Sequence, residues 1–218
     1  SFLMIHPEIA LITNIEDDHL DFYKDARRML DAFQRFIDNV WLNGLVVLNG
    51  DDAYSSTLKP PKGRRLRRFG LKDTNDYHLK NMELYPDRSR ADLCFADKCF
   101  GKLELSVVGR HNMVNALGAA ATALSIGIPF ETVSAALLGF KGVERRFQLI
   151  GNYKNIKVVD DYAHHPTEIN AALQAARQSH QGRIIAVFQP HRYSRTKRLY
   201  KEFGASFKDA DIIIVTEV

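Results

Sequence analysis

The first sixty residues alternate between stretches typical of buried strands and stretches typical of helices. Residues 7–15 form an apolar run that predicts a buried strand. Apolar side chains then recur at helical spacing between residues 26 and 40, which predicts an amphipathic helix with Asp25 at its start. Residues 44–52 predict a second strand that ends in a Gly-Asp turn. Alternation of this kind is typical of α/β folds.

The pattern changes between residues 65 and 108. Short apolar-polar alternations are separated there by Asp, Asn, Pro and Gly, so we predict an antiparallel meander beside the main sheet. Helical patterns return over residues 109–127 and 129–140, and Pro129 suits the first position of the second of these helices.

Residues 141–151 mix glycine, charged and apolar positions, and we place a domain boundary there. Beyond it the pattern predicts elements in the order βαβαβ, over residues 154–159, 166–179, 183–188, 195–208 and 211–216. That order favours a parallel, doubly wound sheet of the Rossmann-like kind. We therefore predict an α/β protein in two parts, residues 1–143 and 144–218.

Composition and charge exclude few classes of protein or ligand. The 218 residues are 45% hydrophobic and 26% charged, which is typical of a globular protein with a substantial core. The net charge of +4 suits an anionic ligand such as a nucleotide or a phosphate, without requiring one. The only two cysteines, Cys94 and Cys99, indicate reduced thiols and a cytoplasmic location.

Two features of the chain as a whole bear on its class. No apolar run approaches the roughly 18 residues of a membrane span, so we expect no membrane partner. The chain begins at Ser1 and stops at Val218 within an apolar strand, so we interpret it as an internal piece of a longer protein.

Polar residues gather at the carboxyl ends of predicted strands, which is where α/β sheets bind ligands. The first cluster holds Asp17, Asp18, His19 and Asp21. One interpretation is a divalent-cation site in which Asp18 orients the imidazole of His19. The alternative is a helix entry, because aspartates in a first turn interact favourably with the helix dipole.

A second cluster, GRHNMVN, opens the helix predicted at residue 109. His111, Asn112 and Asn115 would share one helical face near the positive end of the helix dipole. A carboxamide offers both a donor and an acceptor, as recognition of an adenine edge requires. Capping of the helix is the alternative explanation for the two asparagines.

The third cluster combines DDYAHHPTEI (160–169) with FQPHRYSRT (188–196), which both follow strands of the second part. Pro166 suits the first helical position, which places His165 at the cap. Arg192 and Arg195 are three residues apart, so they form either a clamp for a carboxylate or phosphate or a solvated basic face.

Two further interpretations remain open at this stage. A zinc hydrolase would use His164, His165 and His191, although adjacent histidines point in different directions and rarely share a metal. A nucleic-acid-binding protein would use the basic run KGRRLRR (62–68). We interpret that run as solvated surface and expect no nucleic-acid partner, because no aromatic residues are interleaved with it.

Five motifs occur together in one order along the chain, and they resemble those of the ATP-dependent Mur ligases: TNIEDDHLDFY, GRHNMVNALGAAATA, GVERRFQLIG, VVDDYAHHPTEI and FQPHRYSRT. The resemblance covers the whole chain. It implies that residues 1–143 are the later part of a P-loop-type ATPase domain and that residues 144–218 begin a Rossmann-like, amino-acid-binding domain. The P-loop and a UDP-substrate domain would precede residue 1.

The resemblance implies nucleotide-binding roles for several of these residues. His19 would be a ligand of Mg²⁺, Arg146 would contact the phosphates of ATP, and Asp161 would hydrogen-bond the ribose. The adenine would be contacted by His111, Asn112 and Asn115. ATP would then contact both parts of the chain, with residues 142–151 as a hinge.

The resemblance also implies an amino-acid pocket in the second part. Its lining would be Tyr162, His164, His191, Arg192 and Arg195. The two arginines would hold the carboxylate of the amino acid. We expect one of the two histidines to accept a proton from the attacking ammonium group, because imidazole titrates near neutrality.

Within the family, the motifs are most similar to members that join L-alanine to UDP-N-acetylmuramate in the bacterial cytoplasm. The implied reaction is ATP-dependent amide formation through an acyl phosphate. Two alternatives stay open: a relative that recycles murein tripeptide, and a nucleotide-binding regulatory module without catalysis.

Overall fold

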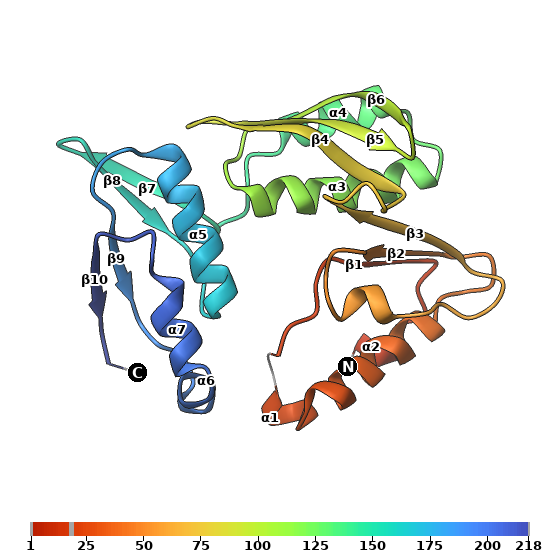
Figure 1. Ribbon diagram of the computed structural model, residues 1–218, viewed down its shortest axis with the longest axis horizontal. Helices are drawn as coiled ribbons and strands as arrows, with labels where there is room; N and C mark the ends of the chain where they lie inside the picture. Colours follow the sequence, from red (N-terminus) through yellow and green to blue (C-terminus); the bar gives the residue numbers. More distant parts are fainter. Residues whose placement is uncertain (1, 18–19, 218) are drawn as a thin grey trace. The chain divides into compact units, whose positions relative to one another are not determined.

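The computed structural model describes residues 2–17 and 20–217, which form two compact units (Figure 1). Unit 1 comprises Ser1–Met82, Arg90–Glu104 and Met113–Leu138. Unit 2 comprises Glu83–Ser89, Leu105–Asn112 and Gly139–Val218. The α/β class predicted from the sequence is confirmed, because each unit contains helices together with parallel strands.

A six-stranded sheet forms the centre of unit 1. In spatial order its strands are β1 (Ile9–Ile12), β2 (Leu45–Asn49), β3 (Arg65–Gly70), β4 (Tyr77–Leu84), β5 (Ser89–Phe95) and β6 (Lys98–Leu105). The helices of this part of the chain are α1 (Leu20–Tyr23), α2 (Ala26–Asp38), α3 (Arg110–Ser125) and α4 (Phe130–Gly139). Two short 3-10 helices, η1 (Phe2–Met4) and η2 (Ser55–Thr57), complete it.

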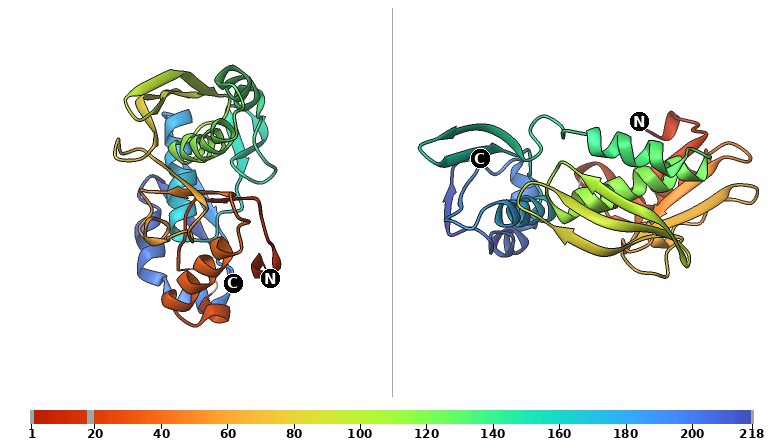
Figure 2. Two further views of the ribbon diagram at one scale, coloured as in Figure 1. Left: turned by 90° about the vertical axis from the view of Figure 1, so that its right-hand side faces the viewer. Right: turned by 90° about the horizontal axis from the view of Figure 1, so that it is seen from above.

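Helices cover both faces of the sheet at β2, where Leu45 to Leu48 are fully buried. Ile37 of α2 packs with Val46 on one face. On the other face Phe69 of β3 lies against Gly118 of α3. Figure 2 shows the green helices α3 and α4 alongside the yellow-green strands β4 to β6. The predicted cap of α2 is confirmed, since the Asp25 carboxylate accepts a hydrogen bond from the backbone N–H of Arg28 at 2.8 Å.

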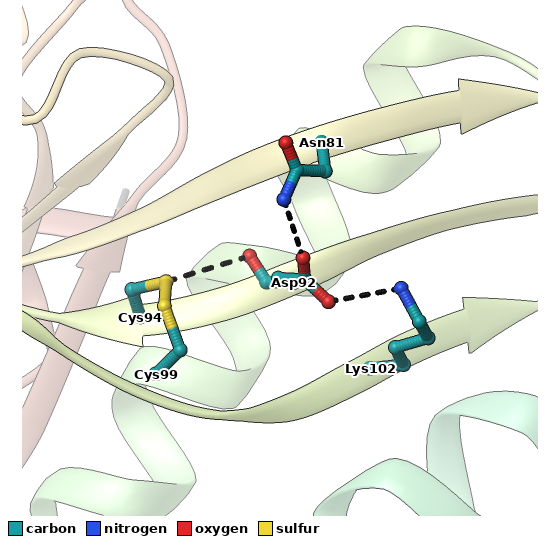
Figure 3. Close-up of a disulfide and its surroundings, with 5 residues drawn as sticks. All are labelled: Asn81, Asp92, Cys94, Cys99 and Lys102. Carbon is teal, nitrogen blue, oxygen red and sulfur yellow. Dashed lines mark hydrogen bonds and ion pairs between the residues drawn. A yellow bond between two sulfur atoms is a disulfide. The ribbon is translucent and has the colours of Figure 1, made fainter.

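The predicted meander is partly wrong. Strand β3 pairs with β2 in parallel, and β4 pairs with β3 in parallel, so the main sheet continues through residue 84. Only the last two residues of β3, Phe69 and Gly70, pair with residues of β4. The chain therefore returns only a short distance along β3 before β4 begins. The six residues of the connection therefore suffice, although parallel strands usually need a longer crossover. Antiparallel hairpins do follow, from β4 to β5 and from β5 to β6 (Figure 3).

The expectation of reduced thiols is also wrong. Cys94 and Cys99 form a disulfide across the β5–β6 hairpin (Figure 3). The turn between these strands is so short that the two residues face one another. Beside them the Asp92 carboxylate accepts hydrogen bonds from Asn81 at 2.7 Å and from Lys102 at 3.1 Å. These two donors hold the pKa of Asp92 below its ordinary value.

Unit 2 contains two small sheets. Strands β7 (Gln148–Tyr153) and β8 (Ile156–Asp160) form an antiparallel pair, and β9 (Ile185–Phe188) and β10 (Ile212–Val215) form a parallel pair. The helices are α5 (Pro166–Ser179), α6 (Tyr193–Arg198) and α7 (Tyr200–Ser206). Their core joins Ile169 and Leu173 of α5 to Phe203 of α7, with the Phe188 ring 5.5 Å from the Phe203 ring.

The pattern analysis did not predict β7, and β8 pairs with β7 rather than within a βαβαβ sheet. The turn between the two strands uses Lys154 and Asn155, both with positive φ (46° and 67°). This turn lacks the glycine that usually marks such hairpins in a sequence. The helix predicted over residues 195–208 is two helices, because the backbone at Leu199 leaves helical geometry.

None of the helices among residues 2–17 and 20–217 combines the length and the apolar character that a membrane crossing requires.

The contact between α3 and β3 predicts opposite effects for one substitution at two helical glycines. A Cβ at Gly118 would lie 2.9 Å from the buried ring of Phe69, whereas a Cβ at Gly204 would meet nothing within 4 Å. Ala is about 1 kcal/mol better than Gly in a helix, but overpacking a core costs about 1–3 kcal/mol. In calorimetry of the full-length protein we expect Gly118→Ala to lower the melting temperature and Gly204→Ala to leave it unchanged or raise it. A higher melting temperature for Gly118→Ala would contradict the packing described here.

Candidate functional site

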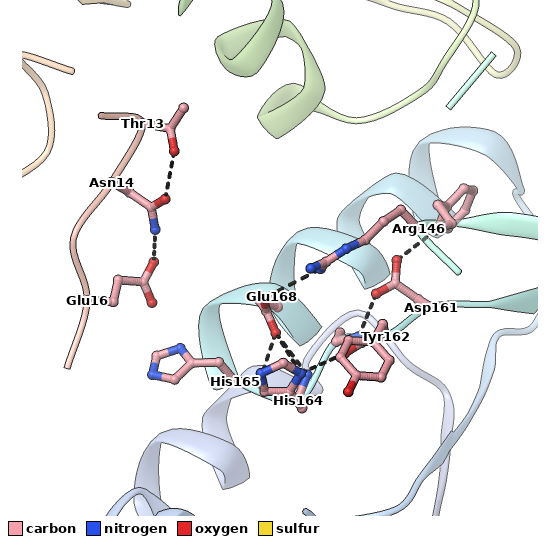
Figure 4. Close-up of polar contacts among 11 residues, drawn as sticks. Thr13, Asn14, Glu16, Arg146, Asp161, Tyr162, His164, His165 and Glu168 are labelled. Carbon is pink, nitrogen blue, oxygen red and sulfur yellow. Dashed lines mark hydrogen bonds and ion pairs between the residues drawn. The ribbon is translucent and has the colours of Figure 1, made fainter. Parts of the chain in front are cut away.

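The candidate site lies in unit 2, where β8 ends and α5 begins (Figure 4). The carboxylate of Asp161 accepts two backbone hydrogen bonds there. Its Oδ2 accepts from the N–H of Phe147 and its Oδ1 from the N–H of Ala163, each at 2.8 Å. Asp161 therefore joins the segment before β7 to the segment after β8, and each of its oxygens retains a further acceptor position.

The segment before β7 has unusual backbone geometry. Arg145 and Phe147 lie in the left-handed region, with φ of 57° and 49°. A residue other than glycine in this region is strained unless its surroundings hold it. The restraint comes from residues 161 and 162: Asp161 accepts from Phe147, and the N–H of Tyr162 donates to the carbonyl of Arg145 at 2.7 Å.

The aromatic ring of Tyr162 is held on two sides. The guanidinium of Arg145 lies over the ring, 4.7 Å from its centroid, while its Nε donates to Asp160 at 3.2 Å. The ring of His164 meets Tyr162 edge-on at 5.2 Å. Tyr162 is half-exposed, so one part of the ring is fixed while the rest faces solvent.

The imidazole of His164 has a defined orientation. Its Nδ1 lies 2.9 Å from the carbonyl oxygen of Tyr162. A carbonyl oxygen only accepts hydrogen bonds, so in the neutral ring Nδ1 carries the proton and Nε2 keeps the lone pair. His164 therefore presents Nε2 as a base.

The first turn of α5 is capped as the sequence predicts. His165 is the N-cap and Pro166 is the first helical residue. The carboxylate of Glu168 accepts from the N–H of His164 at 2.9 Å and of His165 at 3.2 Å. A carboxylate at this position also complements the positive end of the helix dipole.

The start of α3 is anchored within unit 2. The N–H of Gly109 donates to Gln178 of α5 at 3.0 Å, and Gln178 donates to the carbonyl of Tyr85 at 2.7 Å. Gly109 has φ of 104°, and a Cβ there would clash with the ring of His111. Glycine is therefore required at this close approach.

His111 lies near Arg146 and Asp161, so the structure brings these three predicted nucleotide contacts together. Burial lowers the pKa of His111, and the positive charge of Arg146 adds to this effect while the Asp161 carboxylate opposes it. The carboxamide nitrogen of Asn112 donates to the carbonyl of Val108 at 2.7 Å, so this residue does tie down the start of the helix. Asn115 is exposed on the next turn of α3.

The second motif follows β9. His191 and Arg192 are exposed in the loop and at the N-cap of α6, whereas Arg195 is buried, with 3% of its surface accessible. Arg192 adopts a left-handed φ of 68°, which is an uncommon conformation for arginine. The two guanidinium groups are thus in different environments and do not form one solvated basic face.

The predicted metal ligand His19 and its neighbour Asp18 lie outside the described residues. At the end of β1 the described side chains of Thr13, Asn14 and Glu16 form a hydrogen-bonded chain (Figure 4). Across residues 2–17 and 20–217, no three His, Cys, Asp or Glu side chains are grouped to hold a metal ion.

The same finding bears on the zinc interpretation, because the three histidines that it invokes are all described and form no such group.

The basic run at residues 62–68 is largely committed to protein contacts. Arg64 donates to the carbonyl of Val40 at 2.9 Å, and Arg65 donates to the carbonyl of Ser125 at 3.2 Å.

Pattern analysis missed two residues of this site. Glu168 stands three residues after the N-cap, which is the capping-box spacing, so its hydrogen bonds could have been predicted. Arg145 carried no such signal, because its contact with Tyr162 depends on the fold of the segment before β7.

Two family models match the chain. The Mur ligase middle domain matches residues 2–123, and the Mur ligase, glutamate ligase domain matches residues 145–218. The UDP-N-acetylmuramate–L-alanine ligase of Desulforamulus reducens is 45% identical over 219 residues, which cover 100% of this chain and 47% of the relative. The ligase of the same name from Aquifex aeolicus is 39% identical, over 100% of this chain and 48% of the relative.

A solved structure supports the same relationship. The UDP-N-acetylmuramate–alanine ligase MurC of Thermotoga maritima matches with a TM-score of 0.82 and 33% identity, over 99% of this chain and 47% of that one. The present chain spans about half the length of the curated relatives it matches.

The lowered pKa of His111 predicts a pH dependence of stability. Below the ordinary histidine value, near 6.5, the unfolded chain binds a proton that the folded protein does not. The free energy of unfolding therefore falls as the pH drops from about 6.5 towards the folded pKa, and His111 has no effect on it above that window. Melting temperatures of the full-length protein between about pH 5 and pH 7.5 should fall less steeply for His111→Asn. Equal slopes for the two proteins would refute the assignment.

Proposed function

This chain belongs to the Mur ligase family, and we propose that it is part of a UDP-N-acetylmuramate–L-alanine ligase. The whole enzyme would join the muramoyl carboxylate to the amine of L-alanine at the expense of ATP. The observation that carries the proposal is the arrangement of Tyr162 and His164 after β8, in which Nε2 of His164 keeps its lone pair. It occurs in a chain that is 45% identical to a relative of that name.

The proposed residues act by position and charge. When bound, ATP supplies the phosphoryl group that activates the muramoyl carboxylate as an acyl phosphate. The Nε2 of His164 accepts a proton from the ammonium group of alanine, which leaves an amine able to attack the acyl carbon. Phosphate leaves as the amide bond forms. His191 is the second candidate for this base.

Nucleotide binding is assigned to the group around Asp161. We assign Arg146 to the phosphates, because its guanidinium is half-exposed and its one described ion pair is long, at 3.5 Å. Asp161 has free acceptor positions for ribose hydroxyl groups. The adenine contacts are assigned to His111, Asn112 and Asn115. A lowered pKa keeps His111 neutral, which suits contact with an uncharged base.

Alanine binding is assigned to the two motifs that follow β8 and β9. Arg195 is buried, and a buried guanidinium makes strong paired hydrogen bonds to a carboxylate. Arg192 holds a strained backbone conformation, as residues at functional sites often do. Tyr162 would complete the lining of the pocket. Mg²⁺, with His19 as its ligand, and a cytoplasmic location stay predictions from the family resemblance.

Phosphate release by the full-length protein tests the proposed reaction. We expect release that requires UDP-N-acetylmuramate, and that is fastest with L-alanine in a scan of amino acids and of murein tripeptide. Release with the tripeptide alone would support the recycling ligase instead. ATP binding without any amino-acid-dependent release would indicate a regulatory module.

The role of His164 predicts a separate kinetic effect. In the full-length enzyme, His164→Asn should lower kcat by about 10²-fold or more, because general-base catalysis contributes that much. The KM for alanine should change by less than about threefold, since the base acts on bound substrate. His180→Asn, at an exposed histidine after α5, is the matched control and should leave both constants unchanged. An unchanged kcat for His164→Asn would refute the assignment.

A further inference from the structure

The carboxylate of Glu168 lies between the segment that carries Arg146 and the segment that carries His164 (Figure 4). Its Oε2 accepts from the N–H groups of His164 and His165 and lies 3.6 Å from the Nδ1 of His164. Its Oε1 lies 3.5 Å from the guanidinium of Arg146. One side chain therefore contacts the proposed base and the proposed phosphate ligand at the same time.

Capping alone does not account for this arrangement. A capping box requires only one oxygen that accepts from the N-cap N–H, and glutamine serves as well as glutamate. The contact with the guanidinium of Arg146 uses the second oxygen, and both this contact and the approach to the imidazole of His164 use the negative charge. Glutamine would supply neither of these in full.

We propose that Glu168 is a positioning residue for the reaction, acting through His164 and Arg146. This inference rests on the proposed function. When the ammonium group of alanine gives its proton to Nε2, His164 becomes an imidazolium that carries, besides the new N–H at Nε2, its original N–H at Nδ1. The carboxylate of Glu168 and the carbonyl of Tyr162 face that N–H and stabilise the charged ring, much as a carboxylate supports histidine in catalytic triads.

The contact with Arg146 links this role to the nucleotide. The ion pair is long and both partners are partly exposed, so it contributes little by itself. A phosphate group is a stronger partner for guanidinium and would draw Arg146 away from Glu168. The negative charge of Glu168 would then act on His164 alone. Glu168 thereby stabilises protonated His164 more strongly when a phosphate group has drawn Arg146 away.

The test compares full-length wild-type enzyme with Glu168→Gln. Glutamine keeps the cap, so the melting temperature should stay within about 2 °C of wild type. We expect kcat to fall about 10- to 100-fold, as it does when a group that orients a functional histidine is removed. The KM for alanine should change by less than about threefold, and ATP should bind as tightly as before or more tightly, because Arg146 loses a competing partner.

Two further variants separate this role from a structural one. Glu131→Gln makes the same change in the first turn of α4 and should leave kcat unchanged. The double variant His164→Asn/Glu168→Gln should be no slower than His164→Asn alone, because both changes remove one function. Additive losses, a kcat for Glu168→Gln within twofold of wild type, or a parallel loss of kcat, ATP affinity and melting temperature would each overturn the proposal.

Failure of the proposed function would look different. A wild-type protein that shows no alanine-dependent phosphate release would refute the proposed function itself. If the wild type prefers another amino acid, the role of Glu168 is tested with that amino acid. The variants are then compared with wild type in the same quantities, namely kcat, the KM for the amino acid and the affinity for ATP.

Discussion

The candidate site depends on one carboxylate that binds two backbone amides. Asp161 accepts from Phe147 on one side and from Ala163 on the other. These bonds hold a strained segment before β7 against the end of β8, and they fix the direction in which the chain leaves that strand. Buried or half-buried N–H groups need such partners, so the same carboxylate satisfies the backbone and shapes the site.

The orientation of the chemical groups follows from that constraint. Because the chain leaves β8 in a fixed direction, the carbonyl of Tyr162 meets the imidazole of His164, and the N-cap of α5 falls at His165. Glu168 then completes the cap and lies beside the ring. Structural and chemical roles are therefore shared by the same few residues, and the charge of a capping residue becomes part of the proposed catalytic machinery.

The sequence predicted local features well and long-range pairing poorly. The caps at Asp25 and His165 and the extent of α5 follow from spacing and residue type, which are local. The parallel pairing of β3 and the β7–β8 hairpin depend on register and on a turn without glycine, which leave no local pattern. Within the site, the motifs at residues 160–169 and 188–196 were found from their positions after predicted strands, and Arg146 only from the family resemblance. The contact of Arg145 with Tyr162 required the folded chain.

The central claim is that residues 160–168 present His164 as a base through Nε2. The most direct measurement is the tautomer of the neutral His164 ring in the full-length protein, read from long-range proton–nitrogen couplings and assigned with the His164→Asn variant. The geometry at Tyr162 predicts the proton on Nδ1. A neutral ring protonated on Nε2 would contradict the account, because that ring would have no lone pair to offer the amine.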